Sequence, residues 1–362
     1  MECSSLPVID FSEWTGSLAT TMQRERYPLS CTFELIDRCN LRCVHCYINQ
    51  PAGSVESRSS EMDTAQVMQL LDRLAEAGCL FITLTGGEVL LRPDFAQIYR
   101  YARQRGFLVS VFTNGTLLTP EIADLLAEIP PVAVEITLYG ATQETYERVT
   151  GVAGSYERCL RGIRLLMERG VKLRLKTFVI TINRHELPQM QKLAEQLGVE
   201  YRYDGIVWPR LDGNTSPMQY QLSLEQVVDI ELSEPEKIRE WVALMNNNGK
   251  KNRAEKVFIC GAGFQSFHID SAGRMSGCIS LRDPSFNLFE MDFNEAWERL
   301  GKERELKRQL HTPCVDCTLG NLCDQCPGWS KSVHHDYESQ VEFICKLAHL
   351  RLERIQQSAI IN

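Results

Sequence analysis

The chain has 362 residues, of which 44% are hydrophobic, and its formal net charge is −8. This length is enough for one large domain and a smaller one, each with its own core. The acidic balance, with no local block of Lys and Arg, argues against nucleic-acid binding. Residues 1–30 have no apolar segment of the signal-peptide type, and no apolar run approaches a membrane span. We therefore expect a cytoplasmic protein with no membrane partner.

Short β-like segments alternate with helical ones from about residue 31 to 208. The expected strands are rich in β-branched and aromatic residues, and they cover 31–36, 80–85, 107–113, 132–139, 171–180 and 199–208. Between them, apolar residues recur at helical spacing, as with Val67, Leu70, Leu71 and Leu74. Four helices are expected to end on a glycine, at Gly78, Gly106, Gly170 and Gly198.

Repeated strand–helix units predict a parallel sheet with right-handed crossovers. Six units are too few for a closed eight-fold barrel. An open six-unit barrel and a doubly wound sheet both stay open on this pattern alone. After Trp208 the alternation ends, and a linker with helices precedes the cysteine-rich segments that begin near Val257.

The chain contains fourteen cysteines, which is many for its length. Because nothing directs the chain out of the reducing cytoplasm, we do not expect disulfides. Ten cysteines lie in clusters, which indicates metal binding; they are Cys39, Cys43 and Cys46, then Cys260 and Cys278, then Cys314, Cys317, Cys323, Cys326 and Cys345. The other four are expected to be small buried hydrophobic residues; they are Cys3, Cys31, Cys79 and Cys159.

Polar or glycine-rich segments follow four consecutive predicted strands. They are "DRCNLRCVHCY" at 37–47, "TGGE" at 85–88, "TNG" at 113–115 and "TLYG" at 137–140. Turn formation would explain any one of them. The carboxyl ends of parallel strands form the edge where active sites are built, so four such segments there predict a functional site.

The spacing of Cys39, Cys43 and Cys46, CX3CX2C after the first strand, resembles the hallmark of the radical S-adenosylmethionine (SAM) enzymes. The resemblance implies that these thiolates hold a 4Fe–4S cluster whose fourth iron is chelated by SAM. An electron from the cluster would then cleave SAM into methionine and a 5′-deoxyadenosyl radical, which abstracts a substrate hydrogen. The alternatives for these thiols are a zinc site or redox chemistry.

The same resemblance implies the residues that contact SAM. Gly86, Gly87 and Glu88 would meet the amino group of its methionine moiety, although Val89 stands where the family usually has Pro. The other implied contacts are Thr113 and Asn114 at the third strand end, Thr137 in place of a common Ser, and Tyr47 against the adenine.

The second cysteine group resembles the SPASM extension of radical SAM enzymes, except that its last CX2C gap is one residue shorter. The resemblance implies two auxiliary 4Fe–4S clusters, one held by Cys314, Cys317, Cys323 and Cys345, the other by Cys260, Cys278 and Cys326. Seven thiolates for eight iron sites would leave one iron open for substrate, or filled by another side chain or water. The clusters would otherwise only relay electrons. Structural zinc is the alternative for this group.

Taken with the resemblance, the fold is expected to be a partial (β/α)6 TIM-like barrel followed by a small SPASM domain. The expected divisions are 1–30 as an N-terminal extension, 31–210 as the barrel, 211–256 as bridging helices, 257–350 as the SPASM domain and 351–362 as a tail.

The resemblance favours oxidation or cross-linking of a ribosomally made peptide, with a flavodoxin- or ferredoxin-type electron donor. Because only about thirty residues precede the first strand, we expect a peptide substrate to be recognised by a separate small protein or by the mouth of the barrel. The alternatives are a dehydrogenase or epimerase that acts on a small molecule, such as a sugar or amino-acid derivative, and, more remotely, an iron–sulfur electron carrier without SAM chemistry. Formylglycine formation is disfavoured, because Ile279 stands where those relatives have an Asp. Candidate substrate contacts are Tyr139, Tyr203, Asp204 and Trp208.

Overall fold

A computed structural model describes residues 25–233, 235–246, 256–309 and 312–361. Cys3, and most of the expected N-terminal extension, lie outside the described residues. The expected bridging segment and C-terminal tail are described except at 234, 247–255 and 362.

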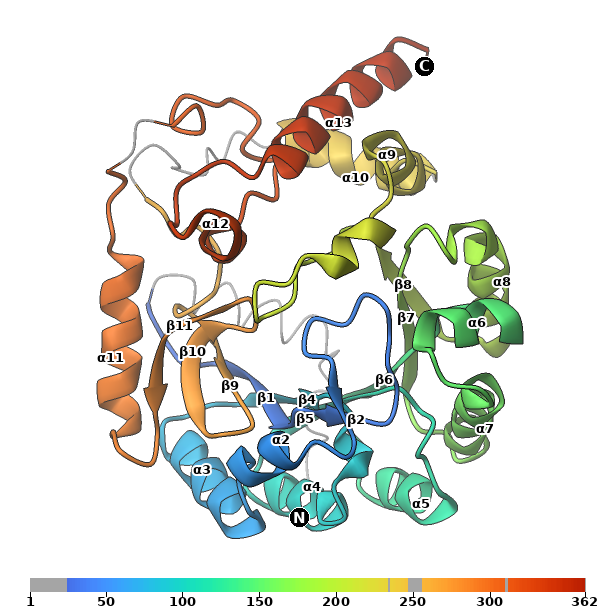
Figure 1. Ribbon diagram of the computed structural model, residues 1–362, viewed down its shortest axis with the longest axis vertical. Helices are drawn as coiled ribbons and strands as arrows, with labels where there is room; N and C mark the ends of the chain where they lie inside the picture. Colours follow the sequence, from blue (N-terminus) through green and yellow to red (C-terminus); the bar gives the residue numbers. More distant parts are fainter. Residues whose placement is uncertain (1–24, 234, 247–255, 310–311, 362) are drawn as a thin grey trace, which may run out of the picture.

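A nine-stranded sheet forms the centre of the molecule, in the order β11-β10-β9-β1-β4-β5-β6-β7-β8 (Figure 1). The six predicted strands are confirmed as β1 (Ser30–Ile36), β4 (Phe81–Gly86), β5 (Leu108–Thr113), β6 (Ala133–Thr137), β7 (Leu173–Phe178) and β8 (Glu200–Asp204). All neighbouring pairs among them run parallel. The last three strands end two to four residues earlier than predicted, because the chain turns there into the loops of the strand edge.

Six helices cover the outer face of these strands (Figure 1). They are α3 (Thr64–Glu76), α4 (Phe95–Gln104), α5 (Pro120–Glu128), α6 (Gln143–Thr150), α7 (Ser155–Glu168) and α8 (Leu187–Leu197). The apolar residues predicted to form the inner stripe of α3 are fully buried. The four predicted glycines all adopt positive φ, between +66° and +90°, as helix ends require. Among the described residues, helices cover one face of these six strands and the sheet ends at β8 and β11 without closing, which is the arrangement of an open barrel rather than a doubly wound sheet.

The two faces of the parallel strands differ in polarity. Val111 and Leu175 point outward into the helix-covered core, whereas their neighbours Phe112 and Lys176 point to the inner face. Parallel strands that are buried on both faces have nearly continuous apolar sequences. The alternation in this chain therefore lines the inside of the open barrel with polar groups, and we call this inner space the lumen.

Three further strands extend the same sheet, which the sequence analysis did not predict. They are β9 (Ser266–Ile269), β10 (Arg274–Cys278) and β11 (Leu281–Asn287). Strand β9 pairs parallel with β1, and β10 and β11 follow antiparallel. Helix α11 (Phe293–Arg304) covers them, with Phe293 and Trp297 packed on Phe267. The cysteine-rich segments thus continue the barrel sheet, and their division from it at 257 stays a prediction.

The remaining helices gather above the barrel (Figure 1). They are α9 (Leu224–Glu231), α10 (Pro235–Asn246), α12 (Pro327–His334) and the C-terminal α13 (Glu342–Ile361). A short 3-10 helix, η3 (Ser216–Tyr220), leads from β8 to α9. In the part of the chain that is described, no helix combines the length and apolar character of a membrane span.

Candidate functional site

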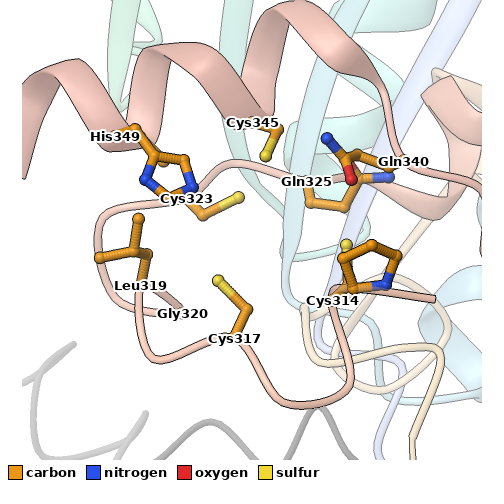
Figure 2. Close-up of a pocket in the computed structure, with 11 residues that line it drawn as sticks. Cys314, Cys317, Leu319, Gly320, Cys323, Gln325, Gln340, Cys345 and His349 are labelled. Carbon is orange, nitrogen blue, oxygen red and sulfur yellow. The ribbon is translucent and has the colours of Figure 1, made fainter.

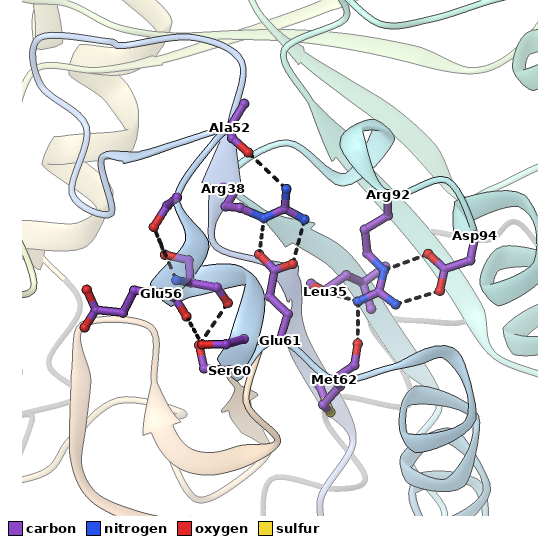
Figure 3. Close-up of polar contacts among 12 residues, drawn as sticks. Leu35, Arg38, Ala52, Glu56, Ser60, Glu61, Met62, Arg92 and Asp94 are labelled. Atoms are coloured by element: carbon purple, nitrogen blue, oxygen red, sulfur yellow. Dashed lines mark hydrogen bonds and ion pairs between the residues drawn. The ribbon is translucent and has the colours of Figure 1, made fainter.

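The loop with the first three cysteines leaves the sheet after β1 and is anchored at both ends (Figure 3). It contains a two-residue parallel pairing of β2 (Arg38–Cys39) with β3 (Gln50–Pro51) and a short helix α2 (Val55–Ser60). Arg38 donates two hydrogen bonds to Glu61, at 2.9 and 2.8 Å, and one to the Ala52 carbonyl at 3.0 Å. The two charged side chains are largely buried, so this fork fixes the loop relative to the strand that carries Cys39.

Arg92 ties the far end of the loop to β1. Its guanidinium donates to the carbonyls of Leu35 and Met62, both at 2.9 Å, and pairs with Asp94 (Figure 3). The same buried side chain therefore holds the start and the end of the cysteine loop.

Gly86 and Gly87 bring the end of β4 against the strand that leads into Cys39. The Gly87 amide donates to the Ile36 carbonyl at 2.7 Å. A Cβ on Gly87 would lie 2.3 Å from the Arg38 carbonyl oxygen, and one on Gly86 would lie 2.0 Å from that of Ile36. Both positions therefore require glycine for close backbone packing.

Glu88 is fully buried behind this contact, and its carboxylate organises the end of β5. It accepts hydrogen bonds from the Thr113 hydroxyl at 2.6 Å, the Asn114 amide at 2.7 Å and the Leu90 amide at 3.0 Å. Burial raises the pKa of Glu88. The hydrogen bonds from these three donors lower it, but burial has the larger effect. Glu88 therefore has a structural role at the end of β5, and its expected pairing with the amino group of SAM stays a prediction.

Asn114 extends this network to the first cysteine. Its Oδ1 accepts from the Thr116 amide at 2.9 Å and the Thr116 hydroxyl at 2.6 Å. Because two donors fix that end of the amide, Nδ2 points the other way, to Asn40 Oδ1 at 2.9 Å and Cys39 Sγ at 3.7 Å.

Each of the three loop thiols has a hydrogen-bond donor. The Leu41 amide lies 3.4 Å from Cys39 Sγ and the Asn49 amide 3.1 Å from Cys46 Sγ, while the Tyr139 hydroxyl contacts Cys43.

Burial raises the pKa of the Cys39 thiol to about 12, with Glu88 adding to the effect, and raises that of Cys43 further. Isolated thiols here would stay protonated, whereas metal ligation requires thiolates. The donors on each sulfur suit thiolates that carry charge, so these residues fit an iron–sulfur cluster.

Tyr47 lies within this loop, directly after Cys46, and Thr137 is the last residue of β6. The Tyr47 hydroxyl donates to Glu34 at 3.1 Å, and the Thr137 side chain bonds to the Tyr139 hydroxyl. The structure therefore places both near the three cysteines, and their expected contacts with SAM stay predictions.

Sequence reasoning missed a buried polar group between β1 and the added strands. Glu34 is fully buried, and its carboxylate meets Arg282 at 2.7 Å and His268 at 3.4 Å. His268 Nδ1 lies 3.0 Å from the Ser276 hydroxyl. The one available signal was a glutamate inside the apolar strand "CTFELI", which needs a buried partner.

Four of the later cysteines surround a cavity of about 80 Å³ (Figure 2). Their sulfur atoms point toward its centre, from the loop before α12 and from α13; they are Cys314, Cys317, Cys323 and Cys345. About 10–15 Å³ is enough to hold one water, so the cavity has room for more than a single ion. Among the described residues, no three His, Cys, Asp or Glu side chains converge tightly enough to hold a single metal ion.

The structure also brings Cys260, Cys278 and Cys326 together. Burial, together with smaller effects of the neighbouring Cys326 and Cys260 thiols, raises the pKa of Cys278 to about 11. The Arg304 side chain bonds to Cys260. The ten clustered cysteines thus form three groups with the membership that the SPASM resemblance implied, while cluster ligation itself stays a prediction.

The other residues singled out from the sequence are mostly structural. Cys31, Cys79 and Cys159 are buried as expected. Tyr203 bonds to the Ile230 carbonyl at 3.0 Å, and Asp204 caps the Ile206 amide at 2.8 Å. Trp208 stacks on Trp329 with ring centroids 4.5 Å apart, and so joins the barrel to the cysteine-rich segments. Of these substrate candidates, only Tyr139 contacts a cluster cysteine.

Comparison with known proteins identifies the family. Residues 33–197 match the Radical SAM superfamily. The chain is 31% identical to an Fe-coproporphyrin III synthase of Methanosarcina barkeri, over 79% of this chain and 80% of that protein. It is 28% identical to an AdoMet-dependent heme synthase of the same organism, over 86% and 94% of the two chains. The chain belongs to the Radical SAM superfamily, and its cofactors are therefore SAM and an iron–sulfur cluster.

Two further proteins similar to this chain are a biosynthesis protein and a protein whose structure contains a precursor peptide. The antilisterial bacteriocin subtilosin biosynthesis protein AlbA of Bacillus subtilis is 28% identical, over 83% of this chain and 67% of AlbA. The crystal structure of Streptococcus suis SuiB bound to precursor peptide SuiA covers 91% of this chain and 80% of SuiB, with a TM-score of 0.65 and 16% identity. At this identity the likeness shows a shared fold.

Proposed function

We propose that this chain is a SPASM-type radical SAM enzyme that oxidises or cross-links a peptide and holds three 4Fe–4S clusters. The observation that carries the proposal is the grouping of ten thiols into sets of three, four and three at separate places in the fold. Cys39, Cys43 and Cys46 would leave one iron of their cluster open for SAM. The other two sets would hold the auxiliary clusters.

The bound cofactors supply an electron and a 5′-deoxyadenosyl radical, which removes a hydrogen atom from the substrate. The residues of this chain position and shield that chemistry. Arg38 and Arg92 fix the cysteine loop, and Asn114 and Tyr139 donate to its thiols. Formation of the new bond releases a proton and an electron, and the auxiliary clusters would accept that electron. Each modification therefore removes two hydrogens from the substrate.

A peptide substrate is supported by AlbA, named for subtilosin biosynthesis, and by SuiB, whose structure contains a precursor peptide. The partners that follow are a flavodoxin- or ferredoxin-type electron donor and a separate protein that binds the leader peptide. The second candidate is oxidation of a small molecule. It is favoured by the two relatives named as Fe-coproporphyrin III synthase and heme synthase.

The decisive experiment is anaerobic co-expression with a short peptide encoded beside the gene, followed by the intact mass of that peptide. Loss of two hydrogens per modification, absent with Cys43→Ala, would support the peptide function. An unchanged peptide, together with accumulation of Fe-coproporphyrin III or heme in the anaerobic cells that is absent with Cys43→Ala, would move the function to the second candidate. Iron analysis tests the clusters, because three of them require about twelve iron atoms per chain.

A further inference from the structure

A triad of charged side chains lies on the inner face of the sheet. It consists of Glu135 on β6, Lys176 on β7 and Arg202 on β8, and we call it the lumen triad. Lys176 Nζ lies 3.5 Å from Glu135 Oε2, and the guanidinium of Arg202 bonds to the same oxygen. The side chain of Glu135 is 7% exposed and that of Lys176 is 20% exposed, so both are mostly removed from water.

When Lys176 is protonated, the lumen triad has one positive charge more than it can neutralise, because two cations share one carboxylate. The nearest further ion pair on these strands, Arg174 with Glu200 at 2.5 Å, is neutral by itself. Lys176 Nζ also lies 3.3 Å from the centre of the Phe112 ring. This cation–π contact attracts the ammonium more weakly than an anion would. Burial lowers the pKa of Lys176 to about 7, and the charge of Arg202 lowers it as well.

The position of the lumen triad places it next to the predicted cofactor site. Lys176 is in register with Thr137, the strand end that the family resemblance assigns to SAM, and with Arg202 on the other side. The helices of the barrel cover the opposite face of these strands (Figure 1). A substrate in the lumen would therefore meet the triad close to the atoms that react.

We propose that Lys176 and Arg202 bind a carboxylate group of the substrate. The inference rests on the proposed function, because it names a chemical feature of the substrate of that same site. A carboxylate carries one negative charge, which matches the surplus of the lumen triad. The carboxylate would accept hydrogen bonds from the ammonium of Lys176 and from the planar guanidinium of Arg202. A peptide offers this group on Asp, Glu or its C-terminus, and a small molecule offers it as a free acid.

The test uses the cluster-loaded, anaerobic protein without turnover and takes sodium propionate as the probe. Lysines are acetylated briefly with acetic anhydride at pH 7.5, and the rate at each site is read by peptide mass mapping. If propionate raises the pKa of Lys176 by about one unit from about 7, the free amine fraction falls about threefold, and labelling slows accordingly. Lys172, exposed just before the same strand, should react equally in propionate and in sodium chloride.

Two variants assign the effect to the lumen triad. Arg202→Gln should abolish the protection of Lys176 by propionate, and its exposed position makes a folding defect unexpected. Arg174→Gln, on the same strand as Lys176 but paired with Glu200, should retain the protection. Equal labelling of Lys176 in propionate and chloride would overturn the proposal.

A further experiment distinguishes a site for a substrate carboxylate from a site for the carboxylate of SAM. If SAM alone protects Lys176 and propionate then adds nothing, the bound carboxylate is that of SAM, and the proposal is overturned. Propionate protection that persists beside SAM supports it. Because no turnover is needed, failure of this test leaves the proposed function intact, and failure to modify a peptide leaves the carboxylate site intact.

Discussion

The side-chain nitrogen of Asn114 lies 3.7 Å from the sulfur of Cys39, and the rest of the network fixes it there. The Thr116 hydroxyl donates a hydrogen bond to the side-chain oxygen of Asn114, and the backbone amide of Asn114 donates one to Glu88 at 2.7 Å. Hydrogen bonds to cluster sulfurs are among the terms that set the reduction potential of an iron–sulfur site. If Cys39 ligates the predicted cluster, Asn114 would therefore act as a positioning residue that also adjusts the charge at this ligand.

Asn114→Asp should make the midpoint potential of the SAM-binding cluster more negative. The substitution keeps the acceptor for Thr116 but turns an oxygen toward Cys39 and Asn40 in place of the N–H donors. The potential is read from the EPR signal that changes when SAM is added. Asn214→Asp, in an exposed loop, is the matched control. An unchanged potential in Asn114→Asp would show that the contact does not act on the cluster.

Gly87→Ala should destabilise the protein by about 1–3 kcal/mol, because the new Cβ meets two backbone oxygens that cannot move aside cheaply. The displaced segment carries Arg38 and Cys39, so iron content should fall together with the free energy of unfolding. Gly53→Ala is the control in the same loop, since nothing lies within 4 Å of its Cβ position. Equal stability of the two variants would contradict the packing role of Gly87.

Much of the fold and of the site could be predicted from the sequence, because the signals are local. Strand–helix alternation, glycine helix ends and cysteine spacing each depend on residues close together in the chain. These signals located β1 and β4 to β8, and together with the family resemblance they assigned each clustered cysteine to its group.

The contacts that were missed join residues far apart in sequence. The pairing of β9 with β1 links Phe267 to Cys31, and nothing in either segment marks its partner. The lumen triad likewise combines residues of three strands, each of which looks like an ordinary surface charge in isolation. Spatial neighbours of this kind become visible only once the register of the strands is known.

Glu186→Gln should lower stability at neutral pH by about 2 kcal/mol, because a carboxylate that accepts several hydrogen bonds loses its charge. Glu186 accepts from the amides of Ala141 and Thr142 and from the hydroxyls of Thr142 and Thr145, at 2.6–3.0 Å. These contacts hold the loop after β6 that carries Tyr139.

The effect of Glu186→Gln should also depend on pH. Burial alone would raise the pKa of Glu186, but the hydrogen bonds from Thr142 and Thr145 outweigh it and lower the pKa below 4.5. Because the pKa of Glu186 is lower in the folded state than in the unfolded state, its ionised form stabilises the fold at pH values above the unfolded-state pKa of about 4.3. This stabilisation is lost as the pH falls through the folded-state pKa. Urea unfolding should therefore show the difference from wild type narrowing below about pH 4. Glu195→Gln, exposed on α8, the helix that follows Glu186, should show no difference at any pH.

Arg351→Met should destabilise the protein by about 3–5 kcal/mol, because it leaves the mostly buried carboxylate of Glu231 uncompensated. The Arg351 guanidinium is 1% exposed, pairs with Glu231 at 2.5 Å and Asp324 at 2.7 Å, and donates to the Leu322 carbonyl at 2.9 Å. It thereby joins α13 to α9 and to the segment between Cys323 and Cys326.

The same substitution should loosen the two later cysteine groups, since each has a member on that segment. Urea unfolding and iron content should both fall in Arg351→Met. Arg299→Met removes an exposed pair with Glu295 on α11 and should cost only about 0–1 kcal/mol. If Arg351→Met unfolded like Arg299→Met and kept its iron, the docking of α13 would depend on its apolar contacts instead, and the cysteine groups would not need the buried ion pair to keep their shape.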